Sequence, residues 1–301
     1  MTIASLFKGI KATFMTLMQT PTLNQYDPFV MTVNSQSNEE SYWIPLAAGG
    51  VRKLLDTVQF KELTDRKMTI VNEDWYDSIR EMRNNIRDSE EYLSGNVQMQ
   101  INNVVSKWES NKVTTVDNLI GTNGNAFDGQ AFFSTSNRTN IATALSTAGV
   151  INQIAGAGTT TTLIMDDFGV AKTALIGFRD SNKQYFNDPN NLNLYVLAPY
   201  TLADSLHRIL DPNMNIVYTT AGPVSNPYAN LAKILIYNTT TNNWILANAN
   251  TPVKPWILQL RQEPIWDMED DRKTKFVDFW YNARMGSGYG SPFGAVRMIN
   301  A

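Results

Sequence analysis

One run of apolar residues constrains the fold of this chain more than any other feature. Just beyond Gly95, apolar side chains recur at helical spacing, and the series is Val97, Ile101, Val104, Val105, Trp108, Val116, Leu119 and Ile120. This spacing places one apolar stripe along a helix. We therefore predict a long amphipathic helix at about 96–119, ended by the glycines at 121–124. Its core-facing side chains are predicted to be Val97, Ile101, Val104, Val105 and Trp108.

Short strands and helices alternate along the rest of the chain. Strand-like runs occupy residues 29–33, 42–46, 192–197, 215–219, 232–237, 244–247, 256–260 and 275–283. One further helix is expected to be capped by Asp166 and Asp167, and another to follow Pro199. The Ser/Thr/Asn-rich stretch at 134–162 is predicted to be a long loop. The order of elements indicates an α+β fold with a mixed or antiparallel sheet.

A charged segment near residues 52–84 has the pattern of a hairpin. Two β-like runs, at 58–63 and 68–71, flank a charged turn at 64–67, and a third run at 75–79 returns. Each run carries charge, and an isolated hairpin is marginally stable in water. We therefore expect this segment to lie against another surface.

The N-terminal residues form a separate amphipathic pattern. Apolar residues recur at helical spacing between Ile3 and Leu17, and Lys8 and Lys11 are the only charged side chains before Asp27. The pattern predicts an amphipathic arm and not an export signal, although a plain surface helix fits the periodicity equally well. The two lysines could contact DNA phosphates, whereas their number alone favours simple solvation.

The composition favours assembly over nucleic-acid binding or membrane insertion. The 301 residues carry a net charge of −3, and only 18% of them are charged, with Asn and Thr filling much of the polar surface. Amides and hydroxyls are less costly to bury against a neighbour than Lys and Glu. The net charge gives no global attraction to nucleic acid, and the sequence lacks the run of about 18 apolar residues that a membrane span requires.

Catalytic constellations are not evident in the sequence. The chain has no cysteine and a single histidine, His207, which excludes Cys-His nucleophiles and paired-histidine metal sites. The acidic cluster between Glu263 and Asp271 is interpreted as a solvated loop, and Gly286–Gly290 as a flexible turn. We therefore predict no enzyme activity, no cofactor and no metal. A hydrolase with an unmarked carboxylate pair stays open as an alternative.

Several strings, in order, carry a resemblance to a known family. They are Gln25-Tyr26, Val30–Ser35, Tyr42–Leu46, Arg66–Ile70, Arg87-Asp88, Phe127–Phe133, Leu197-Ala198-Pro199 and the late Gly288-Tyr289-Gly290. Together they resemble the Mu-like major head subunit (gpT) family of the Hong Kong 97-type capsid proteins. The family often has His-Pro shortly after its Phe-Phe, where this chain has Ser134-Thr135-Ser136. The loop after residue 133 is therefore predicted to be poorly anchored.

The resemblance implies a domain organisation and hinges. It implies an N-terminal arm at 1–36, an extended hairpin loop at 52–84, a peripheral domain at 37–51 and 85–164 with the long helix as its spine, an axial domain at 165–255, and a return to the peripheral domain at 256–301. Glycines at 49–50, 156/158 and 288–294 are hypothetical hinge positions.

The resemblance also implies a function and partners. The chain is expected to be the major capsid protein of a tailed bacteriophage, forming pentamers and hexamers of an icosahedral or prolate head around double-stranded DNA. Portal, scaffolding and head-completion proteins would be partners, and assembly would take place in the host bacterial cytoplasm. The inter-subunit loop residues are predicted to be Lys61, Glu62, Arg66, Lys67 and Trp75. Lys8 and Lys11 would be on a DNA-facing arm. The alternatives are an encapsulin-like nanocompartment shell and another virion structural protein.

Overall fold

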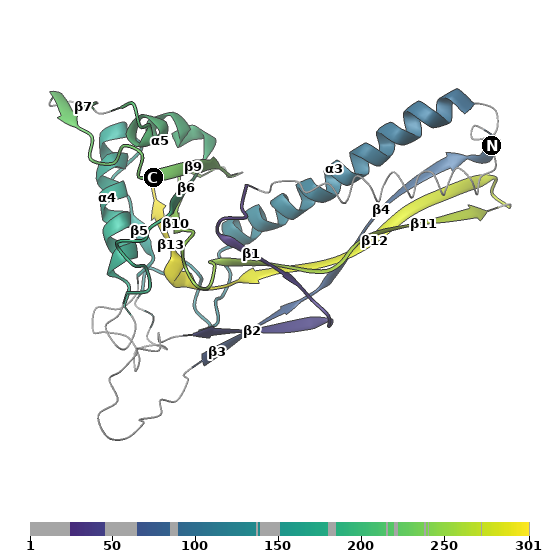
Figure 1. The fold of residues 1–301 in the computed structure, drawn as a ribbon, viewed down its shortest axis with the longest axis horizontal. Coiled ribbons are helices and arrows are strands. Elements are labelled where there is room, and N and C mark those ends of the chain that lie inside the picture. Colours follow the sequence, from purple (N-terminus) through teal and green to yellow (C-terminus); the bar gives the residue numbers. More distant parts are fainter. Residues whose placement is uncertain are drawn as a thin grey trace, which may run out of the picture.

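The computed structural model divides into an elongated blade and a compact body (Figure 1). The structure describes residues 25–45, 65–84, 90–136, 138, 151–179, 185–214, 216–219, 222–237, 239, 241–271 and 273–300. The blade consists of one long helix and a sheet of long strands, whereas the body consists of a second sheet and two helices. The fold is therefore α+β with mixed sheets, as predicted.

The spine of the blade is α3, Glu90–Thr122, a single helix of 33 residues. The predicted helix at 96–119 is therefore confirmed, and it is longer at both ends. Gly121 lies inside the last turn, and the chain leaves the helix through Asn123, which has a φ of 50°. Asn is one of the residues that tolerate this left-handed conformation, which commonly ends helices.

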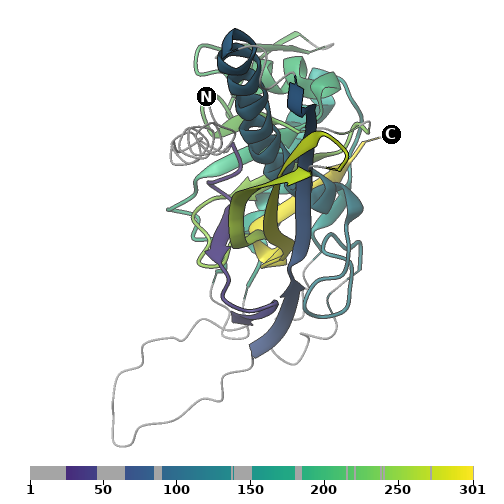
Figure 2. The ribbon, with the colours of Figure 1, turned by 90° about the vertical axis from the view of Figure 1, so that its right-hand side faces the viewer.

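The sheet of the blade has the strand order β1-β11-β12-β4. Its strands are β1 (Val30–Asn34), β11 (Trp256–Asp271), β12 (Phe276–Tyr289) and β4 (Glu73–Met82). The β1 strand runs parallel to β11, whereas the other pairs are antiparallel. Figure 2, viewed nearly along the blade, shows α3 over one face of this sheet.

The body contains a five-stranded sheet with the order β5-β13-β10-β6-β9. Its strands are β5 (Gln153–Ala155), β13 (Ala295–Ile299), β10 (Trp244–Asn248), β6 (Leu194–Ala198) and β9 (Ala232–Ile236). The helical elements of the body are α4 (Thr161–Gly177), η2 (Tyr200–Leu202), α5 (Ala203–Leu210) and η3 (Pro292–Gly294). The order of the strands in the sheet differs from their order in the sequence. The last strand of the chain, β13, lies inside the sheet between β5 and β10.

The central strands of this sheet separate two hydrophobic cores. In β6, Leu197 belongs to the core shared with the blade, whereas its neighbour Val196 belongs to the core under α4 and α5. In β10, Ile245 and Leu246 divide in the same way. Side chains of a strand alternate between the two faces of a sheet, so a strand buried on both faces must be apolar throughout. All five residues of β6 and of β10 are buried, which explains their continuous apolar runs.

Two hairpins project from these sheets. The first pairs β2 (Glu39–Pro45) with β3 (Asp65–Val71), and the second pairs β7 (Ile216–Thr219) with β8 (Gly222–Ser225). The prediction of a charged turn at 64–67 is wrong from Asp65 onward, because those residues are in β3. The run at 75–79 does not return to this hairpin either. It lies in β4, which pairs with β12 over ten residues without a register shift.

Other local predictions need correction as well. The acidic residues from Glu263 to Asp271 are in β11 and not in a loop, and Gly286 and Gly288 are in β12 and not in a flexible turn. The predicted lengths of β11 and β12 were too short, because charged residues alternate with apolar ones at the end of the blade. The predicted helix cap at Asp166 is also wrong, because α4 begins five residues earlier, at Thr161. The predicted loop at 134–162 contains β5.

Candidate assembly surface

The long helix is attached to the sheet through one buried tryptophan and its polar partners. Trp108 is fully buried, and its indole packs edge-on against Tyr281 of β12 with ring centroids 6.3 Å apart. The indole N–H donates to Glu263 of β11 at 3.0 Å. Lys112, one turn along the helix, lies 5.5 Å from the Trp108 ring and forms an ion pair with Glu109 at 2.9 Å. These contacts fix the angle of α3 over the sheet.

The five predicted core-facing residues of the helix all lie in α3. Val104 is buried in the core shared by blade and body, and Val105 packs against that core. Val97 and Ile101 belong to the helix, but their side chains lie outside the described part of the structure.

The face of the blade opposite α3 is exposed. We call it the open face; it comprises the even-numbered side chains of β4 and β12 and the odd-numbered side chains at the end of β11. Trp75 and Ile79 of β4 pack toward the core, whereas Tyr76 is 77% exposed. On β11, Ile265 is 53% exposed. The open face therefore combines exposed large apolar side chains with charged ones.

Two cross-strand ion pairs stiffen the open face. Arg80 of β4 binds Asp278 of β12 with two hydrogen bonds, of 2.6 and 2.8 Å. Arg284 of β12 lies 2.6 Å from Asp74 of β4. Both pairs join residues that are directly opposite in the strand register. They are solvent-exposed, so each contributes little stability, on the order of 0–1 kcal/mol. Their effect is to hold long side chains flat against the sheet.

The β2–β3 hairpin has one buried and one exposed face. Ile44 and Ile70 are buried on the inner face, while Trp43 is 63% exposed on the outer face beside Lys67, its cross-strand partner. On the inner side, Ile70 lies over a strip of β12 that has no side chains. A Cβ atom on Gly288 would lie 2.5 Å from the Ile70 Cδ1 atom. Gly286 and Gly288 of β12 are therefore a contact surface for the hairpin, and the hinge suggested at 288–294 stays a hypothesis.

The root of the hairpin is held by buried polar groups. Asn72, between β3 and β4, donates from its amide to Ser35 Oγ at 3.1 Å and to the Ser37 carbonyl at 2.9 Å. Glu40 accepts hydrogen bonds from the backbone N–H groups of Gln36 and Ser37. These bonds, led by the one from Gln36, lower the pKa of Glu40. These hydrogen bonds therefore fix the direction in which the hairpin projects from the blade.

Of the residues predicted for an inter-subunit loop, the two whose side chains the structure describes, Lys67 and Trp75, lie in different strands. Lys67 is exposed on β3, and Arg66 is in the same strand, with its side chain outside the described residues. Lys61 and Glu62 lie outside the described residues entirely. Trp75 is in β4 and packs against the core of its own subunit, so it is separated from the hairpin. Sequence reasoning missed Trp43, which is the exposed tryptophan of the hairpin, because its neighbours Tyr42 and Ile44 made the run resemble a buried strand.

The first described residues are rooted in the core. Tyr26 and Phe29 are fully buried, and the Tyr26 hydroxyl is hydrogen-bonded to Asp117 of α3. Burial, followed by the contact with Asp117, raises the pKa of Tyr26. Lys254 donates to the Pro28 carbonyl. Residues 25–34, which were expected to belong to an arm, are therefore part of the blade. Lys8 and Lys11 lie outside the described residues.

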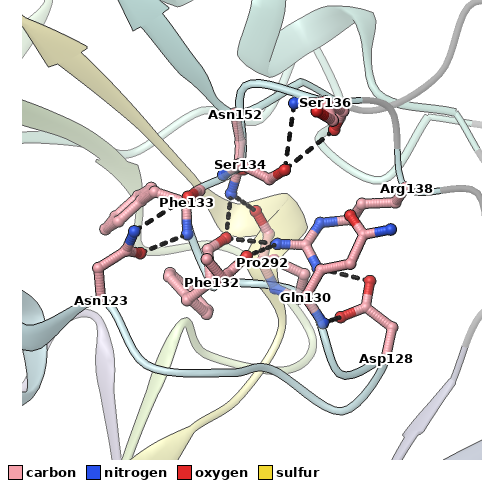
Figure 3. Close-up of polar contacts among 11 residues, drawn as sticks. Asn123, Asp128, Gln130, Phe132, Phe133, Ser134, Ser136, Arg138, Asn152 and Pro292 are labelled. Carbon is pink, nitrogen blue, oxygen red and sulfur yellow. Dashed lines mark hydrogen bonds and ion pairs between the residues drawn. The ribbon is translucent and has the colours of Figure 1, made fainter.

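A buried ion pair locks the loop that follows α3 (Figure 3). Arg138 and Asp128 are 2.6 Å apart, and both side chains are fully inaccessible to solvent. The guanidinium also donates to the carbonyl oxygens of Ala131, at 2.9 Å, and Phe132. Burial lowers the pKa of Arg138, and the charge of Asp128 opposes that effect. Arg138 therefore closes the loop around the Phe132-Phe133 pair.

Two asparagines complete this junction. Asn152 is fully buried, donates to the Phe132 and Pro292 carbonyls at 2.8 and 3.1 Å, and accepts from the Ser134 N–H at 2.9 Å. Asn123 exchanges two hydrogen bonds with the backbone of Phe133. Figure 3 shows the two amides on opposite sides of the Phe132-Phe133 backbone.

The described residues directly after Phe133 are firmly held, whereas residues 139–150 of the loop that was expected to be poorly anchored lie outside the described residues. Ser134, Asn152 and Arg138 hold its described part through hydrogen bonds to backbone groups. The sequence signal that was available is the pair of charges, Asp128 and Arg138, in a stretch with few other charges. Charged side chains are almost never fully buried unless they are paired, and the sequence alone does not identify such a pair.

The described residues show no catalytic or metal-binding arrangement. Among them, no three His, Asp or Glu side chains are grouped so that they could hold a metal ion. His207, the single histidine, lies in the last turn of α5 and belongs to no such group. None of the described helices is long and apolar enough to cross a membrane. The conspicuous features are therefore surfaces: the open face, the hairpin with Trp43, and the rigid junction between blade and body.

Comparison with known families identifies one match. The family model described as Mu-like prophage major head subunit gpT matches residues 3–201, which is about two thirds of the chain. No curated protein sequence matches the chain significantly.

Several solved structures of viral capsids and of a virus-like particle have a similar fold. The chain is similar to the capsid protein of cyanophage P-SCSP1u (TM-score 0.57, 11% identity, 94% of this chain and 91% of that one). It is similar to the procapsid protein of bacteriophage JBD30 (TM-score 0.51, 15% identity, 100% and 77%). It is also similar to the subunit of a virus-like particle from Pyrococcus furiosus (TM-score 0.53, 11% identity, 97% and 98%). The fold is that of the Hong Kong 97-type capsid proteins.

Proposed function

The chain belongs to the family of Mu-like prophage major head subunits, and we propose that its open face and its β2–β3 hairpin are the surfaces through which copies of it join into a head. A major capsid protein of a tailed phage works by self-assembly into a shell. The proposed assembly units are rings of five and six subunits, which close an icosahedral or prolate container around double-stranded DNA.

The exposed outer face of the hairpin is the observation that carries this proposal. Trp43 is 63% exposed on a hairpin whose other face is firmly attached to β12. A large aromatic side chain held rigidly in water is costly alone, and tryptophan is enriched at the energetic centres of interfaces. This exposed tryptophan supports a role for the hairpin in contact with a neighbouring subunit.

We assign the two domains of the capsid protein according to the blade and the body. The blade, with α3 and the sheet of β1, β11, β12 and β4, would be the peripheral domain. The body would be the axial domain, close to the centre of each ring, and it includes β5 and β13 because these strands pair in its sheet. The rigid junction around Arg138 would then transmit orientation from one domain to the other. Large obligate interfaces, on the order of 2,000–5,000 Å² each, would stabilise the shell.

Further partners follow from this role. A shell filled with DNA requires a portal, a scaffold and head-completion proteins, and we expect assembly in the cytoplasm of the bacterial host. Lys8 and Lys11 would contact DNA without sequence preference. An encapsulin-like compartment has the same fold, but the family match favours a phage head. A tail or baseplate role is disfavoured for the same reason.

The proposal predicts that Trp43 is needed for assembly and not for folding. Trp43→Ser should leave the helical and strand content of the full-length chain unchanged, because the side chain contacts mainly solvent. Shell formation, measured by sedimentation and negative-stain microscopy after expression with the neighbouring head genes, should be lost or strongly reduced. Ser41→Ala, on the same face of the same strand, is the matched control and should assemble normally. Normal shells from the Trp43 variant would show that the hairpin is not an interface.

A further inference from the structure

The loop after α3 contains the two dipeptides of this chain that most readily close into a succinimide ring. Asn123-Gly124 is the single Asn-Gly sequence in the chain, and Asp128-Gly129 is the single Asp-Gly sequence. A following glycine favours this ring, because it has no side chain to hinder the approach of its backbone nitrogen to the preceding side-chain carbonyl carbon. Both dipeptides lie in the segment that leads from α3 toward the body. The most labile sequences of the chain are therefore at the junction of blade and body.

The folded structure engages both reacting groups of Asn123-Gly124. The Asn123 side-chain amide donates to the Phe133 carbonyl at 3.0 Å and accepts from the Phe133 N–H at 2.7 Å (Figure 3). The attacking atom would be the Gly124 nitrogen, which donates its hydrogen to the Tyr289 hydroxyl at 2.6 Å. Ring closure requires the side chain to turn and this nitrogen to approach Asn123 Cγ. All three hydrogen bonds must therefore open before the reaction can start.

Tyr289, at the end of β12, is itself held in place. Its hydroxyl donates to the Leu119 carbonyl of α3 at 2.7 Å, and its ring stacks on Phe132 with centroids 5.0 Å apart. Burial raises the pKa of Tyr289, so the hydroxyl stays protonated in mildly alkaline solution. A Cβ atom on Gly124 would lie 3.0 Å from the ring atom Cε2 of Tyr289. The glycine that makes the dipeptide reactive is therefore also the residue that lets Tyr289 come close enough to protect it.

The second dipeptide is held in the same way. The Gly129 nitrogen donates to the Ala126 carbonyl at 3.0 Å. The Asp128 carboxylate is paired with Arg138 at 2.6 Å and accepts from the Gln130 N–H at 3.2 Å. In both labile dipeptides of the chain, the attacking nitrogen and the side chain that it would attack are thus hydrogen-bonded elsewhere.

We propose that Asn123-Gly124 is a site of spontaneous deamidation that folding silences. In the unfolded chain the Gly124 nitrogen attacks Asn123 Cγ, the N–Cγ bond forms, the Cγ–Nδ2 bond breaks, and the side-chain nitrogen leaves as ammonia with the proton of the Gly124 nitrogen. Water then opens the ring at one of its two carbonyl groups, which gives aspartate or isoaspartate at position 123. The reaction uses only water, and in the folded subunit its atoms are held apart.

The product is poorly suited to the junction. A carboxylate has no donor, so one of its oxygens would face the Phe133 carbonyl in place of the Asn123 amide group. Isoaspartate also adds a backbone atom at a residue with a φ of 50°. Deamidation therefore marks chains that remain unfolded, and a marked chain forms a weaker junction. This inference does not depend on the assembly role of the open face and the hairpin.

The first test compares the folded and the unfolded full-length chain. The protein is incubated in mildly alkaline buffer with and without urea, and mass spectrometry of the peptide containing Asn123 follows the loss of the amide. The reaction should be at least about tenfold slower in the folded protein, because it requires local opening. Tyr289→Phe keeps the ring but removes the hydroxyl, so the reaction in the folded variant should be several-fold faster than in the wild type.

Tyr281→Phe is the matched control for that variant. Tyr281 is also on β12, but its ring packs against Trp108, so its removal should leave the rate unchanged. In urea the wild type and both variants should react equally fast. Equal rates for the wild type with and without urea would overturn the proposal, as would an unchanged rate in folded Tyr289→Phe.

The second test asks whether the product weakens the junction. Asn123→Asp reproduces one product in the full-length chain and should unfold at a lower temperature than the wild type. Asn125→Asp makes the same change of charge two residues later, on an exposed side chain, and should unfold as the wild type does. An Asn123→Asp protein as stable as Asn125→Asp would show that the junction tolerates the product, which would refute the marking of unfolded chains.

Discussion

Removing the Arg138 side chain should destabilise the protein more than any surface change. The ion pair with Asp128 is 2.6 Å long, and both side chains have no solvent exposure. Arg138→Ala would leave the Asp128 carboxylate buried without its partner and would free two backbone carbonyls, those of Ala131 and Phe132. Losing one partner of a buried pair costs about 3–5 kcal/mol. That loss is a large fraction of the roughly 5–15 kcal/mol by which a protein is stable.

Urea unfolding at a fixed protein concentration measures this loss. The midpoint should fall strongly, and the slope should stay constant because the surface exposed on unfolding is unchanged. Arg138→Lys is a matched control that keeps the charge but cannot reach all three acceptors, so it should lie between wild type and Arg138→Ala. The double variant Asp128→Asn/Arg138→Met should recover much of the stability, because no uncompensated charge remains. A loss below about 1 kcal/mol for Arg138→Ala would refute the argument that this pair anchors the junction.

Two other changes test the contacts of the hairpin root. Gly288→Ala adds a Cβ atom 2.5 Å from Ile70 Cδ1, so thermal unfolding should show a loss of roughly 1–3 kcal/mol, and a neutral result would mean that the hairpin can shift on β12. Burial, aided by Glu40, raises the pKa of Tyr42 to about 12. Its stabilisation should therefore persist up to about pH 10 and disappear as the pH rises through about 12, and a difference absorbance titration against Tyr42→Phe that finds phenolate already at about pH 10 would contradict the burial.

The regular elements of this fold could be predicted from local patterns. The stripe from Val97 to Trp108 predicted α3, and the apolar run around Val196 predicted β6, because burial on one or two faces leaves a periodic signature. The long strands of the blade were shortened in the prediction. Charged residues such as Asp267 and Asp278 interrupt the apolar pattern there, since only one face of that sheet is buried.

The candidate surface was harder to predict than the fold. Trp75 has charged sequence neighbours and Trp43 has apolar ones, yet Trp75 packs against the core and Trp43 is exposed. Their difference depends on strand register, because β4 pairs with β12 and β2 pairs with β3. Register is set by contacts between distant segments, which the sequence of one chain does not display.

The buried polar groups were missed for a related reason. Arg138 and Asp167 resemble surface residues in sequence, and their burial depends on partners that come from other segments. Asn300 reaches Asp167 only because β13 pairs between β5 and β10 in the sheet of the body. A long-range arrangement of this kind leaves no periodic trace.

The most direct test of the whole account is a cryo-electron microscopy reconstruction of the full-length chain expressed with its neighbouring head genes. The account predicts closed shells of five- and six-membered rings, with the body at the centre of each ring and Trp43 buried against an adjacent subunit. Monomers alone, or shells in which the hairpin and the open face both remain in solvent, would contradict it.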